Sequence, residues 1–526
     1  MGRKIMGRAI DNLTINNREV DNREVELKLS LPPTALAALR QHPLFVAAAP
    51  GDAADVESTY YDTPDFALRA RGIALRLRRI GDTWLQTVKC AAPSACGLSA
   101  RPEWEQIWGA HFDFSGIADA RVRTFLTDNA VRLIPVFNTR FHRETRCHGV
   151  DGARIRVVLD VGEILAGGRS EPLCELELEL DAGTPADLFR LAEQLAATLP
   201  LFPDDRSKAA RGYWLCCGAT PERGPLRAGI VPLTRRQTPV AAFRDLAESC
   251  VQQWQGNVWG ALCDPGSAIA ADPEYIHQLR VGLRRLRSLL RLFAPALPET
   301  FVAIWRRRLG DNARSLNAVR DLDVLCDEVL APVLAACGPD HAGLACLGAA
   351  LETARGEARV AALRQLDLAA QGRLLLGFMA ALHSLPEADA RRGALVALMT
   401  RRLDRALARV ARRLAAARRG EPARLHRLRI ACKQLRYGLD FCAPLLPRKA
   451  VARYVKALAR VQNKLGYLSD VEVARQRLAA VAGDDPELAD AATLVLDWHA
   501  PCCRKRGKRA LQNAQALLAE TPPWRR

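Results

Sequence analysis

Two short stretches of this chain alternate charged and apolar residues, and they constrain the fold more than any other feature. Residues 24–28 read Glu-Val-Glu-Leu-Lys, and residues 174–180 place Glu175, Glu177 and Glu179 at the same spacing. Successive side chains of a β-strand point to opposite faces, so each stretch predicts a strand with one charged and one apolar face. Aligned carboxylates repel one another unless a cation lies among them. The pattern therefore indicates strands whose charged faces surround a cation.

Further segments between residues 24 and 214 have the composition of strands. We predict strands at Val25–Leu29, Ile73–Arg79, Trp84–Lys89, Glu103–Ile107, Phe137–Arg146, Arg154–Leu159 and Leu173–Leu180, and helices at Ala35–Gln41 and Pro185–Leu199. One open sheet with a wet face would leave the charges dispersed in solvent. A closed antiparallel barrel with a polar interior brings them together, and this is the fold we expect for the first part.

The charge of the chain is distributed unevenly. From Pro221 to the end, 49 Lys and Arg stand against 29 Asp and Glu, an excess of +20, whereas the preceding residues hold 27 and 29. The second part is rich in Leu, Ala and Arg with helical periodicity, so we expect it to be all-α. Its basic excess predicts a polyanionic partner.

A chain of 526 residues is too long for a single core. We expect an α+β protein in which an antiparallel β-barrel tunnel precedes a pseudo-twofold, all-α helical-bundle domain. The predicted parts are a disordered leader at 1–22, the barrel domain at 23–216, a Pro/Gly-rich linker at 217–239, the helical domain at 240–518 and a tail at 519–526. No run of about eighteen apolar residues predicts a membrane span. The start of the chain lacks a signal peptide, so we expect a cytoplasmic protein.

The helical half contains an internal repeat. Residues 277–280 (His-Gln-Leu-Arg) recur 149 positions later as residues 426–429 (His-Arg-Leu-Arg). Spacings of three and four place the basic side chains of each copy on one helix face. These are His277, Arg280, Arg284, Arg287 and Arg291 in the first copy, and His426, Arg429, Lys433 and Arg436 in the second. One such helix would ordinarily present a solvated face. The recurrence, together with the basic excess, favours two facing bundles that bind a long anion.

At this point the two halves can be compared with known families. The first half carries Glu24-x-Glu26-x-Lys28, Leu75-Arg76-Leu77-Arg78, Thr87-Val88-Lys89, Glu103-Trp104-Glu105 and Ser207-Lys208-Ala209-Ala210-Arg211-Gly212-Tyr213. It resembles the CYTH family, whose fold is the triphosphate tunnel and which includes class IV adenylyl cyclases and thiamine triphosphatases. The second half resembles CHAD, a helical domain with recurrent histidines. Within CYTH, the chain is similar to the bacterial CYTH–CHAD inorganic triphosphatases.

The resemblance implies a barrel that binds inorganic triphosphate together with Mg²⁺ or Mn²⁺. Phosphate-binding side chains would be Lys28, Arg76, Arg78, Lys89, Arg140, Arg143 and Lys208. Metal ligands would be Glu24, Glu26, Asp160, Glu175, Glu177 and Glu179, with Glu103 and Glu105 as supporting carboxylates. The catalytic set would be Glu24, Glu26, Lys28 and Lys89. Six carboxylates exceed the number one Mg²⁺ uses, which favours two ions. Odd spacing places Arg140 and Arg143 on opposite strand faces.

Phosphoryl transfer depends mainly on positioning and charge neutralisation, so no Ser-His-Asp arrangement is required. We expect a metal-activated water to attack a terminal phosphorus and release orthophosphate and diphosphate. One alternative is an organic triphosphate substrate, as in thiamine triphosphate hydrolysis or ATP cyclisation. Another is a non-catalytic, polyphosphate-binding scaffold. The lack of an evident aromatic pocket favours the inorganic substrate, and the acidic set favours an enzyme because a pure anion binder gains nothing from carboxylates.

For the helical half we expect long-chain polyphosphate as partner, with association to polyphosphate granules. Nucleic acid is the competing ligand of a basic surface, and the sequence disfavours it without ruling it out. Few aromatic residues accompany the basic stripes, whereas single-strand binders use aromatic stacking platforms. No zinc-finger spacing or helix-turn-helix pattern accompanies them either.

Overall fold

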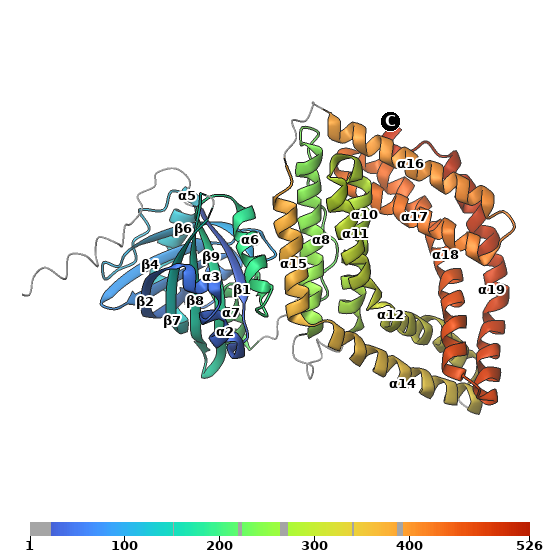
Figure 1. The fold of residues 1–526 in the computed structure, drawn as a ribbon, viewed down its shortest axis with the longest axis horizontal. Coiled ribbons are helices and arrows are strands. Elements are labelled where there is room, and N and C mark those ends of the chain that lie inside the picture. Colours follow the sequence, from blue (N-terminus) through green and yellow to red (C-terminus); the bar gives the residue numbers. More distant parts are fainter. Residues whose placement is uncertain are drawn as a thin grey trace, which may run out of the picture. The chain divides into compact units, whose positions relative to one another are not determined.

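The structure is a computed structural model, which describes residues 23–150, 152–218, 224–262, 272–338, 341–386 and 393–525. The chain divides into two compact units, Met1–Glu222 and Arg223–Arg526 (Figure 1). The leader predicted at residues 1–22 lies outside the described residues.

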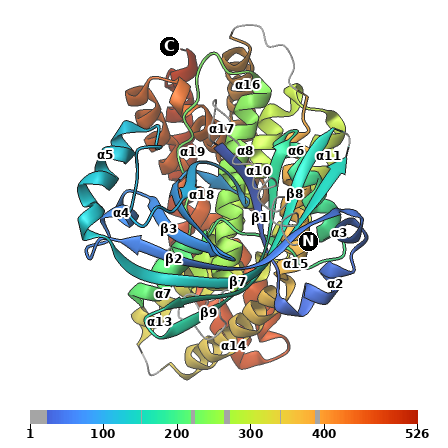
Figure 2. The same cartoon turned by 90° about the vertical axis from the view of Figure 1, so that its left-hand side faces the viewer.

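The first unit is a closed antiparallel barrel, as predicted. Its strands follow the order β1-β9-β8-β7-β2-β3-β4-β6, and β6 returns to pair with β1. They are β1 (Arg23–Ser30), β2 (Ala49–Asp62), β3 (Ile73–Ile80), β4 (Thr83–Cys90), β6 (Leu98–Ile107), β7 (Ile134–Val150), β8 (Ala153–Ala166) and β9 (Arg169–Ala182). Figure 2 shows the long strands β2 and β7 running side by side and curving together. The two-residue strands β5 (Ser94–Ala95) and β10 (Phe202–Pro203) extend the edges of β6 and β1.

Strand register places charged residues on the inner face of the barrel. Lys28 lies opposite Glu177 in the β1–β9 pair, and Asp160 lies opposite Glu175 in the β8–β9 pair. All four side chains are buried. Charged side chains are seldom buried in proteins unless they are paired. The inside of this barrel therefore holds many buried charges of both signs close together.

Part of the apolar core lies outside the barrel wall. Helix α6 (Pro185–Ala196) packs against β1 and β9. Leu29 and Leu176 are paired partners on those strands, and both are fully buried, as is Phe189 of α6. The apolar halves of the alternating strands therefore supply the hydrophobic burial, and the charged halves are free to line the interior.

Three other short helices cover further parts of the barrel. On the β3–β4 side, α4 (Ala67–Ala70) and α5 (Ala120–Asn129) bury Leu68 and Leu126 against the sheet. Helix α7 (Lys208–Cys217) packs against β7, β8 and β9. It brings Tyr213 into an apolar cluster with Tyr60 and Phe137. The remaining helices of this unit are α2 (Leu36–Arg40) and α3 (Pro43–Ala47).

Asp62, the last residue of β2, ties α4 and α7 to the barrel. Its side chain is fully buried. One carboxylate oxygen accepts a hydrogen bond from the backbone N–H of Leu68 (2.9 Å), and the other accepts from the N–H of Arg69 (3.0 Å) and from the Tyr213 hydroxyl (2.7 Å). Because Tyr213 and Lys208 share α7, this carboxylate also fixes where Lys208 enters the interior.

Asp62→Ala is expected to lower the free energy of unfolding by about 2–4 kcal/mol, because it leaves several buried donors unpaired. Urea titration of the full chain measures the change. Asp65→Ala is the matched control, since Asp65 is exposed and forms a surface ion pair with Arg132. That variant is expected to lose less than about 1 kcal/mol. Equal losses in the two variants would contradict the anchoring role of Asp62.

In the second unit the described residues form helices and their connections. The helices are α8 (Pro239–Leu262), α10 (Pro273–Phe293), α11 (Glu299–Arg314), α12 (Asn317–Val324), α13 (Ala331–Cys337), α14 (Ala342–Gln365), α15 (Leu368–His383), α16 (Ala394–Ala416), α17 (Pro422–Cys442), α18 (Arg448–Ala482) and α19 (Pro486–Ala519). The long helices α18 and α19 lie side by side (Figure 1). Within the described part of the chain, no helix has both the length and the apolar character needed to span a bilayer.

The internal repeat is visible in the helical unit. Helices α10 and α17 each contain 21 residues, begin with proline and carry the predicted basic stripes. Each ends in a 3-10 turn that starts Ala-Pro, at Ala294–Ala296 and Ala443–Leu445. All these boundaries differ by the same 149 positions. Helix α10 also packs against α17, so the two copies meet in space.

Candidate active site

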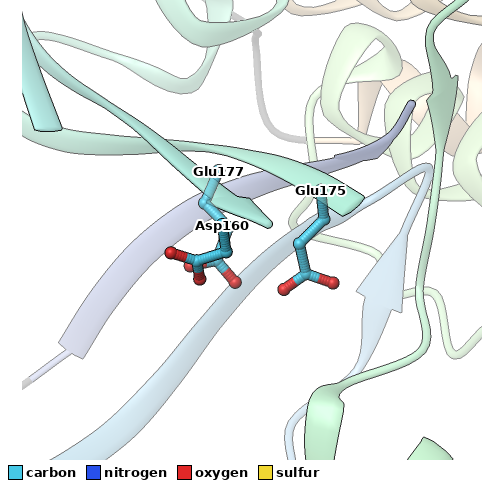
Figure 3. A group of neighbouring side chains, drawn as sticks. All are labelled: Asp160, Glu175 and Glu177. Carbon is cyan, nitrogen blue, oxygen red and sulfur yellow. The ribbon is translucent and has the colours of Figure 1, made fainter. Parts of the chain in front are cut away.

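Three carboxylates gather inside the barrel. Asp160 on β8 and Glu175 and Glu177 on β9 are buried, and each offers a carboxylate oxygen within 4.8 Å of the others (Figure 3). The ammonium of Lys208, from α7, lies among them. It is 2.7 Å from Asp160 and 3.1 Å from Glu177, and it donates a hydrogen bond to Glu175. These oxygens therefore already surround a compact cation.

Arg143 on β7 completes this cluster. Its Nε and one Nη each donate to Asp160 at 2.7 Å, a bidentate geometry, and the same Nη lies 3.3 Å from Glu177. Burial would raise the pKa of Glu177, but Lys208 and then Arg143 outweigh it and hold that pKa well below its usual range. Burial raises the pKa of Glu175, although Lys208 opposes the rise. The cluster thus keeps at least part of its negative charge buried, which requires cations.

A second acid–base group lies where β1, β4 and β6 meet. The Lys89 ammonium is 2.8 Å from both Glu24 and Glu103. Arg101 lies 3.8 Å from Glu24 and donates a hydrogen bond to Glu26. Burial raises the pKa of Glu103 to about 7, against the pull of Lys89 and with a further rise from the Glu24 carboxylate. Glu103 can therefore hold or release a proton near neutral pH.

The six predicted metal ligands fall into two sets in the structure. Asp160, Glu175 and Glu177 form the compact cluster. The other three, Glu24, Glu26 and Glu179, have their own basic partners within the barrel. Glu179 lies 2.9 Å from Arg156, and burial raises its pKa to about 7.

The predicted phosphate-binding residues lie inside the barrel with one exception. Arg76 and Arg78 on β3 are both buried. Arg76 lies 3.4 Å from the Tyr60 hydroxyl and 3.8 Å from Glu103. Burial, with Arg76 and Arg143 nearby, lowers the pKa of Arg78 to about 10. Both guanidiniums remain charged at neutral pH and aim into the interior.

Arg140 is the exception, and the structure corrects its predicted role. Its side chain is 61% exposed and pairs at 2.9 Å with Glu57 on the neighbouring strand β2. Residues 140 and 143 face opposite sides of β7, and the inner side belongs to Arg143. Lys28 and Glu105 do face inward. The Lys28 ammonium donates to the backbone carbonyl of Arg206 (2.9 Å), and Glu105 accepts from the Thr87 hydroxyl (2.7 Å).

Several inward-facing residues were not among the predicted site residues. They include Ser58, Tyr60, Thr87, Ser99, Arg101, Thr139 and Arg156. Strand parity was the available signal for the two arginines: Arg101 precedes Glu103 by two positions, and Arg156 precedes Asp160 by four. The hydroxyl residues carried no charge to set them apart from ordinary strand residues.

In the helical unit, the central members of the two basic stripes come together. Arg284 of α10 donates from Nε to the Tyr437 hydroxyl of α17 (2.6 Å). Burial, together with the nearby Arg284 and Arg429, lowers the pKa of Lys433 to about 7. These side chains from both copies therefore share one electrostatic environment, which we call the α10–α17 basic cluster: Arg280, Arg284, Arg429 and Lys433.

Several residues of the stripes also have individual partners, Arg429 of the basic cluster among them. Arg429 lies 3.1 Å from Asp470, Arg436 lies 2.8 Å from Asp440 of its own helix, and a ring nitrogen of His426 lies 3.0 Å from the Ser469 hydroxyl. Burial lowers the pKa of His277 to about 4. Burial and the neighbouring Arg306 lower the pKa of both Arg287 and Arg291. Burial and neighbouring basic side chains thus both lower the pKa values of these stripe residues.

A closed barrel with a charged interior, followed by a helical unit with repeated basic helices, defines a two-domain protein of the tunnel type. Residues 22–213 match the CYTH domain, and residues 245–479 match the CHAD domain. The chain is a CYTH–CHAD protein, which confirms the resemblance inferred from its motifs.

Three proteins to which the chain is similar each match part of it. It is 32% identical over 161 residues to a protein of Haemophilus influenzae named inorganic triphosphatase, and the match covers 30% of this chain and 45% of that one. A crystal structure of the CHAD domain from the plant Ricinus communis is 27% identical, with a TM-score of 0.48, covering 57% of this chain and 98% of that one. PptA from Streptomyces chartreusis is 18% identical, with a TM-score of 0.39, covering 53% and 98%. The chain thus spans less than half the length of the named triphosphatase.

Proposed function

We propose that the barrel hydrolyses inorganic triphosphate with the help of Mg²⁺ or Mn²⁺, and that the helical unit binds long-chain polyphosphate. The observation that carries the first part is the buried cluster of Asp160, Glu175 and Glu177 around the Lys208 ammonium. The part of the chain that matches the named inorganic triphosphatase at 32% identity supports the choice of substrate.

The barrel interior has two chemically distinct walls. In the ring of strands, β1 stands four positions from β2, and β9 stands four positions from β3, so these pairs face each other across the interior. Strands β1, β6, β8 and β9 carry the carboxylates, whereas β3 carries Arg76 and Arg78. A triphosphate held between these walls would meet guanidinium donors on one side and a cation held by carboxylates on the other.

The residues present fit a divalent cation of the hard class. Carboxylate oxygens are the ligands that Mg²⁺ and Mn²⁺ prefer, and Asp160, Glu175 and Glu177 offer three within 4.8 Å. These three side chains would hold the ion. When bound, such an ion neutralises phosphate charge and lowers the pKa of water.

The chain's own side chains supply the remaining requirements. Arg76 and Arg78 orient the phosphoryl oxygens, and Lys89 adds a point charge beside Glu103. Glu103 can accept a proton near neutral pH because its pKa lies at about 7. The rings of Tyr60 and Phe137 stack on each other at 4.4 Å and are already used in packing. This arrangement favours an inorganic substrate over one with a base to stack.

A phosphate-release assay on the full chain tests the proposal. Triphosphate, thiamine triphosphate and ATP are compared with Mg²⁺, with Mn²⁺ and with a chelator. We expect triphosphate to be hydrolysed fastest, to orthophosphate and diphosphate, and activity to disappear with the chelator. Faster turnover of either organic substrate, or hydrolysis that ignores the chelator, would overturn the assignment.

Polyphosphate binding by the helical unit is supported by the α10–α17 basic cluster and by the charge excess of this half. A competition titration on the full chain carrying Glu177→Gln, which slows any consumption of the ligand, tests it. We expect double-stranded DNA at equal charge concentration to displace polyphosphate poorly. Ready displacement would make nucleic acid the better ligand. Association with polyphosphate granules would follow from tight binding.

A further inference from the structure

Two buried hydroxyls inside the barrel have no hydrogen-bond partner among the residues that the structure describes. Ser58 on β2 and Thr139 on β7 lie directly opposite each other, and their exposed fractions are 1% and 0%. Arg78 on β3 lies opposite Ser58 on the other side. Within the described residues, the two hydroxyl oxygens have no hydrogen-bond partner. Among the same residues, the Nε of Arg78 has none either. Three unpaired polar groups on adjacent strands thus point into one part of the interior.

The surroundings of the two hydroxyls cannot satisfy them. On one side along β2 and β7 lies an apolar cluster with Val56 and Phe141. On the other side lies the cluster of Tyr60 and Phe137. A buried polar group without a partner is destabilising, and folded proteins rarely retain one without a reason. Two of them, side by side between apolar clusters and next to an unpaired guanidinium nitrogen, indicate a place where a ligand supplies the missing acceptors.

The chemistry of these groups defines the ligand. A guanidinium N–H only donates, and a hydroxyl can donate to an anion, so the matching ligand is an oxygen anion. Hydrogen bonds to charged oxygen are about twice as strong as those between neutral groups. The wall formed by β2 and β3 faces the carboxylates of β1 and β9 across the barrel. A phosphate chain held at the carboxylate wall would therefore turn its other oxygens toward Ser58 and Thr139.

We propose that Ser58 and Thr139, together with Arg78, form a hydroxyl-lined subsite that donates hydrogen bonds to phosphoryl oxygens of the substrate on the side away from the carboxylates. This inference rests on the proposed function and assigns two neutral residues to substrate affinity. The register of β2, β3 and β7 holds the three donors in place before the ligand arrives, so little ordering is needed on binding.

Ser58→Ala, Thr139→Val and the double variant of the full chain test the subsite. Binding of tripolyphosphate is titrated without divalent metal, and KM and kcat are measured with Mg²⁺. Each single variant is expected to bind about tenfold more weakly, with a matching rise in KM and a smaller change in kcat. The thermal midpoint of the unliganded variants should stay unchanged or rise, because an unpaired hydroxyl has been removed.

Thr59→Val is the matched control, since Thr59 neighbours Ser58 on β2 but belongs to the opposite face. Its affinity should equal that of the unaltered chain. The subsite is refuted if the double variant binds within about twofold of the unaltered chain, or if the unliganded variants melt earlier than Thr59→Val. If the unaltered chain bound tripolyphosphate but did not hydrolyse it, the proposed hydrolase function would be wrong. The binding titration of the variants would still test the subsite.

Discussion

Replacing Glu177 by Gln is expected to lower kcat for triphosphate hydrolysis by at least about a hundredfold, the scale of losing one electrostatic element of a phosphoryl-transfer site. Glutamine keeps the size of the side chain but removes its charge. Glu177 contacts Lys208 at 3.1 Å and Arg143 at 3.3 Å, so the change leaves two buried cations with one carboxylate fewer. The variant should also bind the metal more weakly. In a plot of phosphate release against Mg²⁺ or Mn²⁺ concentration, its midpoint should therefore lie at a higher metal concentration.

The control for this variant is Glu163→Gln. Glu163 is also a strand carboxylate, on β8, but it accepts from the Ser170 hydroxyl and lines a cavity of about 1020 Å³ together with the exposed Arg140. Its kcat should remain within about twofold of the unaltered chain. Glu24→Gln tests the other acidic group, because Glu24 pairs with Lys89 at 2.8 Å. If Glu24→Gln and Glu177→Gln both retain full metal-dependent turnover, the carboxylates have no part in the reaction and the enzymatic proposal fails.

Most of the barrel could be predicted because its strands alternate charged and apolar residues. Strand β2 was missed although residues 56–61 (Val-Glu-Ser-Thr-Tyr-Tyr) have strand composition, and its first half explains why its start could not be predicted. Residues 49–55 read Ala-Pro-Gly-Asp-Ala-Ala-Asp, a composition typical of turns, and most of them are exposed. Their strand conformation comes from pairing with β7, whose register even shifts between Pro50 and Ala53. Such tertiary pairing overrides local propensity and leaves no local signal.

The candidate site could be predicted only in part, because the alternation of side chains along a strand shows which residues share a face but not which face is inside. Parity shows that Arg140 and Arg143 face opposite sides, but it cannot tell which side is inside. The structure decides it, because Thr139, Phe141 and Arg143 share the inner face of β7. Lys208 posed a different difficulty. It belongs to helix α7, and only the closed fold shows that a helical residue enters a cluster of strand carboxylates.

Neutralising Arg284 and Lys433 together, as Arg284→Gln with Lys433→Gln, is expected to weaken polyphosphate binding about a hundredfold near 0.1 M salt. These side chains stand where α10 meets α17, at the centre of the basic cluster. Each lost phosphate contact should also reduce the slope of log affinity against log salt concentration by about 0.7, so the loss of two contacts should reduce this slope by about 1.4. Arg453 and Arg475, exposed bases of α18, form the control pair. An equal loss in that pair would mean that binding depends on total charge alone.

Lys433 also gives polyphosphate binding a pH signature. With a pKa of about 7, its side chain is charged below that pH and neutral above it, so its attraction for a polyanion is full near pH 6 and largely lost near pH 8. The nearby His277 stays neutral across this window, because its pKa is about 4. Affinity of the unaltered chain should therefore fall from about pH 6 to about pH 8 at constant ionic strength, with proton uptake on binding. Lys433→Arg should bind equally at both pH values, because a guanidinium stays charged. A flat profile for the unaltered chain, or the same fall in Lys433→Arg, would show that Lys433 does not contact the polyanion.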